Sequence, residues 1–127
     1  NGTLRIIDYK SGKAILDEDL SFKDWDEIAD NPEKDKLFQV LMYVYLFLKN
    51  NPKYINTDVV AGIFSFRNLD NGLQIVEKER KLIFDNNTLD AFEKQLTRII
   101  KRIVNEDFFA NEDVSKCKFC SHIDILN

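Results

Sequence analysis

One stretch of the chain, residues 37–48, is apolar at almost every position. It reads LFQVLMYVYLFL, and Gln39 is the residue that interrupts it. Asn31-Pro32 before the stretch is a typical helix start, an N-cap residue followed by proline at the first helical position, and Pro52 after it is a stop signal. The pattern predicts a helix of about five turns. Since the helix is apolar nearly all round, we expect other elements to cover most of its faces.

Runs rich in β-branched residues on either side of this helix predict strands. Residues 4–10 (LRIIDYK) predict one strand, and the preceding Asn1-Gly2 is typical of a hairpin turn. We therefore expect the chain to start at the bend of a hairpin whose first arm lies upstream. Residues 58–66 (DVVAGIFSF) form a short, continuous apolar run, which predicts an interior strand covered on both sides.

The remaining segments predict an α/β fold with one more strand and one more helix. Residues 73–84 predict an edge strand because their middle is charged, and residues 14–28 predict an acidic connector of mixed structure. Asn87 or Thr88 can cap a last helix with one apolar face. That face comprises Leu89, Phe92, Leu96, Ile99, Ile100, Ile103 and Val104. The other face carries Lys94, Arg98, Lys101 and Arg102, which we interpret as solvated.

The composition limits the chain to one soluble domain. Its 127 residues, 44% of them hydrophobic and ten of them Phe, suffice for one packed core and exclude wholesale disorder. The sequence shows neither a membrane-spanning run nor a signal peptide, and its two cysteines make no secreted disulfide framework, so we expect a cytoplasmic protein. Because Met42 is the only methionine and the chain starts at Asn1, we expect part of a domain.

The net charge bears on the partners of the chain. Eighteen basic and twenty-two acidic residues give −4, with a pI near 5.0. This is the wrong sign for holding nucleic acid by bulk electrostatics, so any contact with DNA has to be local.

An acid-x-Lys pattern in the first strand is the strongest candidate for chemistry. Residues two apart on a strand point the same way, so Asp8 and Lys10 share a face while Tyr9 points away. A carboxylate beside an ammonium can hold a divalent cation and place a positive charge near a phosphate. The alternative is an ordinary surface ion pair, worth under ~1 kcal/mol. Glu79-Arg80-Lys81 repeats the spacing within a charged run, where a solvated edge explains it.

The apolar helix adds two polar side chains on one helical face, Gln39 and Tyr43. A glutamine in such surroundings has several hydrogen-bonding sites to satisfy, so we expect Gln39 to face a polar site. For Tyr43 and its neighbour Tyr45, plain core packing is the alternative interpretation.

Together these motifs resemble the PD-(D/E)XK nuclease superfamily in its RecB-like branch, the nuclease domain of bacterial helicase-nucleases. The resemblance covers residues 4–66, from IIDYKSGK through QVLMY to the buried strand. It implies a restriction-endonuclease-like core, a central mixed sheet flanked by helices. It also implies DNA as partner, a helicase-nuclease polypeptide in recombinational repair as context, and exonuclease-like phosphodiester hydrolysis with Mg²⁺ or Mn²⁺.

Each motif residue receives a role from this resemblance. Asp8 would be a metal ligand, joined by the Tyr9 carbonyl, and Lys10 would orient the attacking water and steady the phosphate. Gln39 would lie near the catalytic lysine and Tyr43 toward the DNA backbone. The superfamily also uses a further Asp on the preceding strand, and this chain has no such strand before Asn1. We therefore expect a single, N-terminally partial domain over residues 1–127, catalytically incomplete by itself.

Residues 107–127 form a C-terminal tail with the chain's two cysteines, Cys117 and Cys120. Some RecB-like nucleases hold an iron-sulfur cluster there, but residues 121–127 lack the further cysteine, so we do not expect a cluster. Zinc held by the two cysteines and His122 would need a fourth ligand such as Asp124. Two reduced thiols are the plain alternative.

Two other functions remain open. A noncatalytic module could keep the fold for binding DNA ends or a partner protein, and an upstream strand ending in Asp would distinguish the nuclease from it. A small metal or redox domain could be built around the tail, and elemental analysis without zinc or iron would remove it.

Overall fold

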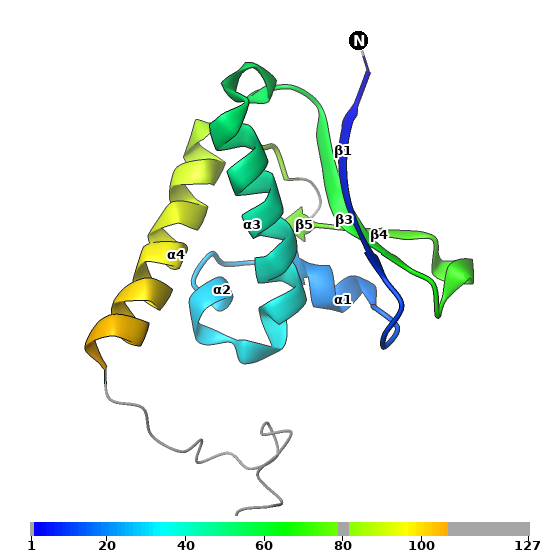
Figure 1. Cartoon of the computed structure of the whole chain (residues 1–127), viewed down its shortest axis with the longest axis horizontal. Coiled ribbons are helices and arrows are strands. Elements are labelled where there is room, and N and C mark those ends of the chain that lie inside the picture. The colour runs from blue at the N-terminus through cyan, green and yellow to red at the C-terminus, as the bar shows by residue number, and fades with distance from the viewer. Residues whose placement is uncertain (1, 79–81, 107–127) are drawn as a thin grey trace, which may run out of the picture.

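A three-stranded mixed sheet is the centre of the fold, which we describe from a computed structural model of residues 2–78 and 82–106 (Figure 1). Its order is β1 (Leu4–Lys10), β3 (Val59–Ser65) and β4 (Leu73–Ile75). β1 and β3 are parallel and in register from Leu4 opposite Val59 to Lys10 opposite Ser65, whereas β4 is antiparallel to β3. A sheet flanked by helices confirms the expected α/β class.

The long helix α3 (Asp35–Asn50) connects the two parallel strands and covers one face of the sheet. A 3-10 turn, Pro32–Lys34, precedes it, and the Asn31 side chain accepts a hydrogen bond from the Glu33 N–H, so the predicted start is confirmed. Of the apolar stretch, Tyr43 and Leu46 are exposed. The buried residues are Leu37, Val40, Leu41, Val44 and Leu48. Each buried aliphatic side chain contributes about 1.5–3 kcal/mol relative to an exposed one.

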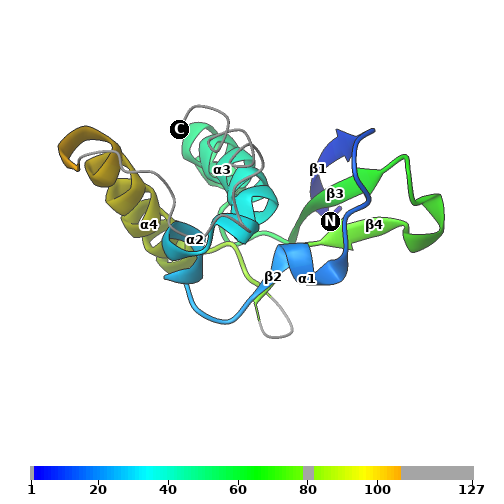
Figure 2. The same cartoon turned by 90° about the horizontal axis from the view of Figure 1, so that it is seen from below.

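Helix α4 (Asn86–Asn105) forms a second layer on α3, on the side away from the sheet (Figures 1 and 2). Phe92 packs against Phe38 and Tyr45 of α3 at ring-centroid distances of 5.9 and 5.6 Å. The predicted cap is wrong by two or three residues, because the Asp85 carboxylate accepts the Thr88 N–H at 2.8 Å. This bond holds the pKa of Asp85 below its usual value.

Only the first half of the predicted apolar face of α4 is buried in the described part of the chain. Leu89 and Phe92 are in the core, whereas Ile100, Ile103 and Val104 are exposed. The periodicity correctly predicted a helix. It did not predict that only the first part of its apolar face is buried against other elements.

The basic face of α4 is less solvated than predicted, because it holds helix α2 (Glu27–Asp30). Arg98 reaches Asp26 at 3.0 Å and Asp30 at 2.9 Å, and Arg102 lies 3.5 Å from Asp30. Two of the four cations therefore pair with acids in or just after the connector: Arg98 with Asp26, and both arginines with Asp30.

The connector itself contains α1 (Asp17–Leu20), the short strand β2 (Ser21–Phe22) and the start of α2. β2 pairs in parallel with β5 (Glu77–Lys78), which forms a second, two-stranded sheet. The predicted strand over 73–84 is therefore wrong as one element: β4 lies at the edge of the main sheet, and the chain then joins the other sheet.

Gly62 explains how β4 comes so close to β3. A Cβ built on Gly62 would meet the Gln74 carbonyl oxygen and lie 3.0 Å from the Ile75 Cα, so only glycine allows this approach.

The sheet is unequally covered. In Figures 1 and 2, α2, α3 and α4 all lie on one side of β1 and β3. We predicted that β3 is covered on both faces. In the part of the chain that the structure describes, helices cover one of its two faces. None of the described helices is long and apolar enough to cross a bilayer. The turn at Asn1, the charged run 79–81 and the cysteine tail at 107–127 lie outside the described residues.

Candidate active site

The carboxyl end of β1 carries the acid-x-Lys pair, on the face that α3 covers. Lys10 Nζ lies 2.8 Å from Asp8 Oδ2, and the two side chains are 24% and 18% exposed. Tyr9 projects from the opposite face, as alternation along a strand requires. An ion pair that is three-quarters buried or more keeps both charges in a fixed place, which a fully solvated surface pair does not.

Helix α3 extends this pair into a chain of four side chains. Lys10 Nζ donates a hydrogen bond of 2.6 Å to Gln39 Oε1, and Gln39 Nε2 donates one of 3.0 Å to the Tyr43 hydroxyl. The glutamine thus satisfies both ends of its amide with polar partners, which removes the cost of placing it in an apolar helix. The structure brings the four residues Asp8, Lys10, Gln39 and Tyr43 together.

The direction of these hydrogen bonds decides which donors Tyr43 and Lys10, at the two ends of this chain of contacts, can offer to a ligand. The Tyr43 hydroxyl accepts from Gln39, so its own proton remains available to an outside acceptor, and Tyr43 is 41% exposed. At the other end, the Lys10 ammonium has three N–H donors, and its polar contacts among the described residues are to Gln39 and Asp8. The row therefore presents donors suited to a phosphate group.

Sequence patterns did not single out Ser65, which lies opposite Lys10 in the parallel register. Its side chain shares the inner face with Ile63, it is 2% exposed, and its Oγ has no hydrogen-bond partner among the described residues. Asp8 Oδ2 is likewise buried without a hydrogen bond, so its contact with Lys10 is an ion pair only. The alternation of side chains along β3 could have placed Ser65 on the inner face. Its position opposite Lys10 was not predictable from the sequence.

Asp8 has the chemistry to hold a hard divalent cation, since carboxylate oxygens are the ligands that Mg²⁺ prefers. Asp8 Oδ2 is buried and lies 2.8 Å from Lys10 Nζ, so a cation bound by this carboxylate would share it with the lysine. Within residues 2–78 and 82–106, no three His, Cys, Asp or Glu side chains gather into a metal-binding group. The described site therefore fits a metal through Asp8, with further ligands to come from water, substrate or other carboxylates.

A comparison with protein-family models tests the resemblance. The model of the PD-(D/E)XK nuclease superfamily matches residues 1–125. The chain belongs to this superfamily. The match extends well beyond the motif region, so the mixed sheet and its helices are the restriction-endonuclease-like core of a PD-(D/E)XK protein. Searches of curated proteins and of solved structures gave no significant match.

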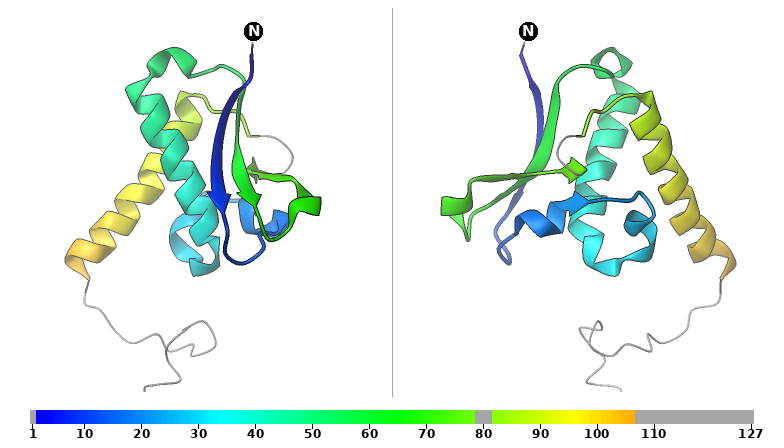
Figure 3. Two further views of the ribbon diagram at one scale, coloured as in Figure 1. Left: turned by 45° about the vertical axis from the view of Figure 1, so that its right-hand side comes forward. Right: turned by 180° about the vertical axis from the view of Figure 1, so that it is seen from behind.

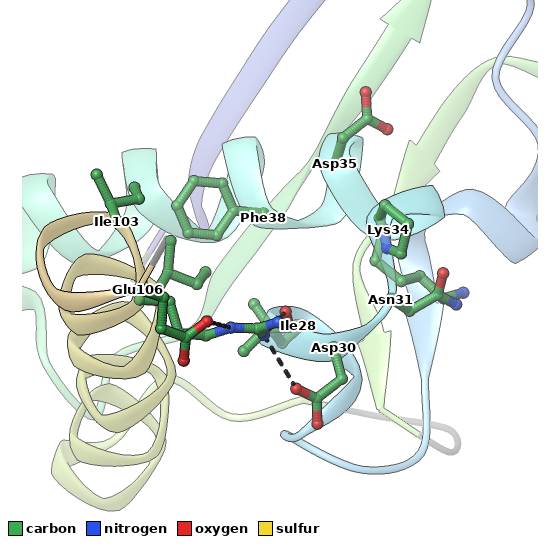
Figure 4. A pocket seen from close by; sticks show the side chains of 12 residues that line it. Ile28, Asp30, Asn31, Lys34, Asp35, Phe38, Ile103 and Glu106 are labelled. Carbon is green, nitrogen blue, oxygen red and sulfur yellow. Dashed lines mark hydrogen bonds and ion pairs between the residues drawn. The ribbon is translucent and has the colours of Figure 1, made fainter. Parts of the chain in front are cut away.

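A separate hollow of about 580 Å³ lies between α2, the start of α3 and the end of α4 (Figure 4). Arg102 joins its walls, 3.5 Å from Asp30 and 3.6 Å from Glu106. Lys34 at its rim already donates to the carbonyl oxygens of Glu18 and Ser21. Its lining mixes the acidic Asp30, Asp35 and Glu106 with the basic Lys34 and Arg102, and it contains none of the residues of the acid-x-Lys pair.

Proposed function

We propose that this PD-(D/E)XK protein provides the phosphodiester-hydrolysing site of an exonuclease-like, metal-dependent DNA nuclease of the RecB-like branch. The observation that carries the proposal is the continuous row Asp8, Lys10, Gln39 and Tyr43, assembled from β1 and α3 at the carboxyl end of a strand. We further propose a cytoplasmic repair or recombination protein, with a helicase-nuclease polypeptide as the context.

Lys10 has the central role in this proposal. Its ammonium is held by Gln39 and Asp8. In this position it orients the attacking water and offsets the negative charge that develops on the phosphate. The Tyr43 hydroxyl donates a hydrogen bond to the DNA backbone. Gln39 keeps Lys10 and Tyr43 at fixed positions. The attacking water releases a proton to the solvent as it forms the new P–O bond, the bond from phosphorus to the leaving oxygen breaks, and the leaving oxygen takes up a proton from the solvent.

Asp8 and the Tyr9 carbonyl are the groups of this chain that would hold Mg²⁺ or Mn²⁺. When bound, the ion would supply Lewis-acid polarisation of a phosphate oxygen and of the attacking water. The Asp8 carboxylate would then interact with both the cation and Lys10. The hydrogen bond from Lys10 to Gln39 would keep the lysine in place.

The second carboxylate that the superfamily uses has a natural position in this fold. Among the described residues, β1 pairs only with β3, so its other edge carries no strand. We propose that an upstream strand pairs there and brings its Asp next to Asp8. Side chains of directly paired residues on one face lie about 5 Å apart, within reach of a shared cation.

The test compares the chain with a version extended upstream in its reading frame, each incubated with end-labelled DNA and Mg²⁺ or Mn²⁺. We expect cleavage by the extended protein and a loss of about 10³-fold or more in its Lys10→Ala variant, since the lysine acts at the transition state. Lys81→Ala is the matched control, because Lys81 ends the other acid-x-Lys pattern. Undiminished cleavage by Lys10→Ala would disprove the site.

A noncatalytic module that binds DNA ends is the second candidate. It is favoured by one observation, the lack of a three-residue metal-binding group among the described residues. The same experiment separates the two, because a module would bind DNA without cleaving it in either version.

A further inference from the structure

Three buried side-chain oxygens have no hydrogen-bond partner among the described residues. They are Asp8 Oδ2, Ser65 Oγ and Gln74 Oε1, and no other buried side-chain nitrogen or oxygen in residues 2–78 and 82–106 shares this condition. Leaving such an atom unpaired costs free energy, so each one calls for an explanation. All three belong to the main sheet, one to each of its strands β1, β3 and β4.

The side chains that carry these oxygens lie on the inner face of the sheet. Ser65 is opposite Lys10 in the parallel register of β1 and β3, and Gln74 is opposite Ile63 in the antiparallel register of β3 and β4. Directly paired residues point the same way and lie about 5 Å apart. In Figure 3 (left), β1 (blue) and β3 (green) run side by side and end at the same edge. The unpaired oxygens therefore gather at the part of the sheet that carries Lys10.

The Gln74 amide is turned toward the end of β3. Its Nε2 donates at 2.8 Å to the carbonyl oxygen of Asn71, in the 3-10 turn Leu69–Asn71 between β3 and β4. Ser65 is the last residue of β3. Ser65 and Gln74 are 2% and 6% exposed, so bulk water does not satisfy their oxygens. The hydroxyl and the amide oxygen therefore share one enclosed part of the inner face.

The donors and acceptors of these groups are complementary. The Lys10 ammonium has three N–H donors and two polar contacts among the described residues, to Gln39 and Asp8. A serine hydroxyl both accepts and donates, whereas an amide oxygen only accepts. The order ammonium, hydroxyl, amide oxygen is therefore the one in which each group finds a partner.

We propose that Ser65 and Gln74 are positioning residues for Lys10. They form a relay in which the Lys10 ammonium donates to Ser65 Oγ and the Ser65 hydroxyl donates to Gln74 Oε1. The relay forms when the Asp8 carboxylate loses part of its attraction for the ammonium, as it does on binding a cation. Gln39 then holds the ammonium from α3 and Ser65 holds it from β3. The benefit for catalysis rests on the proposed function, whereas the relay itself does not.

The first test needs neither DNA nor metal. In the upstream-extended protein, Asp8→Asn keeps the shape of the side chain and removes its charge, so the relay should form. NMR on protein with ¹⁵N-labelled lysine measures how fast the Lys10 ammonium protons exchange with water, and Lys10→Arg identifies the signal by its loss. We expect added Ser65→Ala to accelerate this exchange by roughly 3- to 30-fold, the equivalent of one hydrogen bond. Ser65→Thr keeps a hydroxyl and should keep the exchange slow.

Gln74→Leu in the same background should accelerate the exchange by a smaller factor, because it removes the acceptor that orients the Ser65 hydroxyl. Gln95→Leu is the matched control. Gln95 is also 6% exposed, but it lies on α4 and donates to Asp26. We expect it to leave the Lys10 signal unchanged.

The second test separates positioning from a structural role. Ser65→Ala alone should not lower the thermal midpoint, since its buried hydroxyl has no partner among the described residues while Asp8 contacts Lys10. In the extended protein with Mg²⁺ and DNA, the same variant should lower kcat by about 3- to 30-fold and leave KM unchanged, because Lys10 acts at the transition state. Ser65→Thr should restore kcat.

Three results would overturn the relay: ammonium exchange that does not respond to Ser65→Ala, an equal acceleration in Ser65→Thr, or a thermal midpoint that falls in Ser65→Ala. The relay and the nuclease fail separately. If the NMR responses appear but the extended protein cleaves no DNA, the relay is retained and the nuclease is lost. If the protein cleaves DNA but the Lys10 signal ignores Ser65, the reverse holds.

Discussion

The two faces of the sheet use the same strands in opposite ways. On the inner face, α3 covers β1 and β3, and the polar residues Asp8 and Lys10 are partly buried among apolar ones. On the outer face the aromatic residues Tyr9 and Phe66 are exposed, although apolar side chains are the ones that gain from burial. The inner face thus holds two charged residues among buried apolar ones, and the outer face leaves aromatic rings exposed.

Packing on the two faces should differ in energy, and this is the largest effect we expect on stability. Ile63 is fully buried on the inner face, and Ile75 is 40% exposed on the outer face. Ile63→Ala should lower the free energy of unfolding by about 2–5 kcal/mol, and Ile75→Ala by about 1 kcal/mol or less. Urea denaturation of the two variants measures the difference. Equal losses would mean that the outer face is as well packed as the inner one.

The inner face should depend on Gln39 for activity rather than for stability. Gln39→Leu removes the acceptor of the Lys10 hydrogen bond and the donor to Tyr43, so we expect cleavage by the extended protein to fall by about 10- to 100-fold. Its thermal midpoint should change little, since leucine suits an apolar helix. Tyr45→Phe, on the same helix but bonded to Glu93, serves as the control. A stable, fully active Gln39→Leu variant would show that cleavage does not depend on the contacts of Gln39 with Lys10 and Tyr43.

The helical cover of the inner face should be sensitive to acid, with a smaller effect. The Asp85 carboxylate caps α4, which lowers its pKa in the folded protein. The stabilisation is present above the unfolded pKa of about 4 and is lost as the pH falls through the lower folded value. At neutral pH, Asp85→Ala should cost about 1 kcal/mol of the free energy of unfolding, and the difference from the unchanged protein should shrink in acid.

Asp90→Ala, an exposed position of α4 that donates no cap, is the control for this prediction. A difference between Asp85→Ala and the unchanged protein that stays constant from pH 7 to strongly acidic solution would show that the cap does not act through its charge.

Local signals predicted the elements of this fold well. The start of α3 followed from Asn31-Pro32, and the apolar run at 58–66 correctly predicted the central strand β3. The errors came from contacts between distant segments. The strand over 73–84 divides because its second part pairs with β2, some 56 residues earlier in the register Ser21 to Glu77. No local pattern encodes such a pairing.

The candidate site shows the same division. The acid-x-Lys spacing and the lone glutamine in an apolar helix indicated which side chains would be polar and buried, and the structure places them in contact. Ser65 was not predicted, because its relation to Lys10 depends on the parallel register of β1 with β3. The cationic partners of α2 on α4 were also missed, since Arg98 and Asp26 are far apart in the sequence.

The parallel pairing of β1 with β3 has a consequence for how the chain folds. Leu4 meets Val59 only after α3 has brought the two strands back together, so the pairing closes a long loop. We expect α3 to gain helical structure before the strands dock. During that interval the segment 58–66 is an unpaired apolar strand, the kind of segment that associates with its own copies. Refolding yield should therefore fall as protein concentration rises.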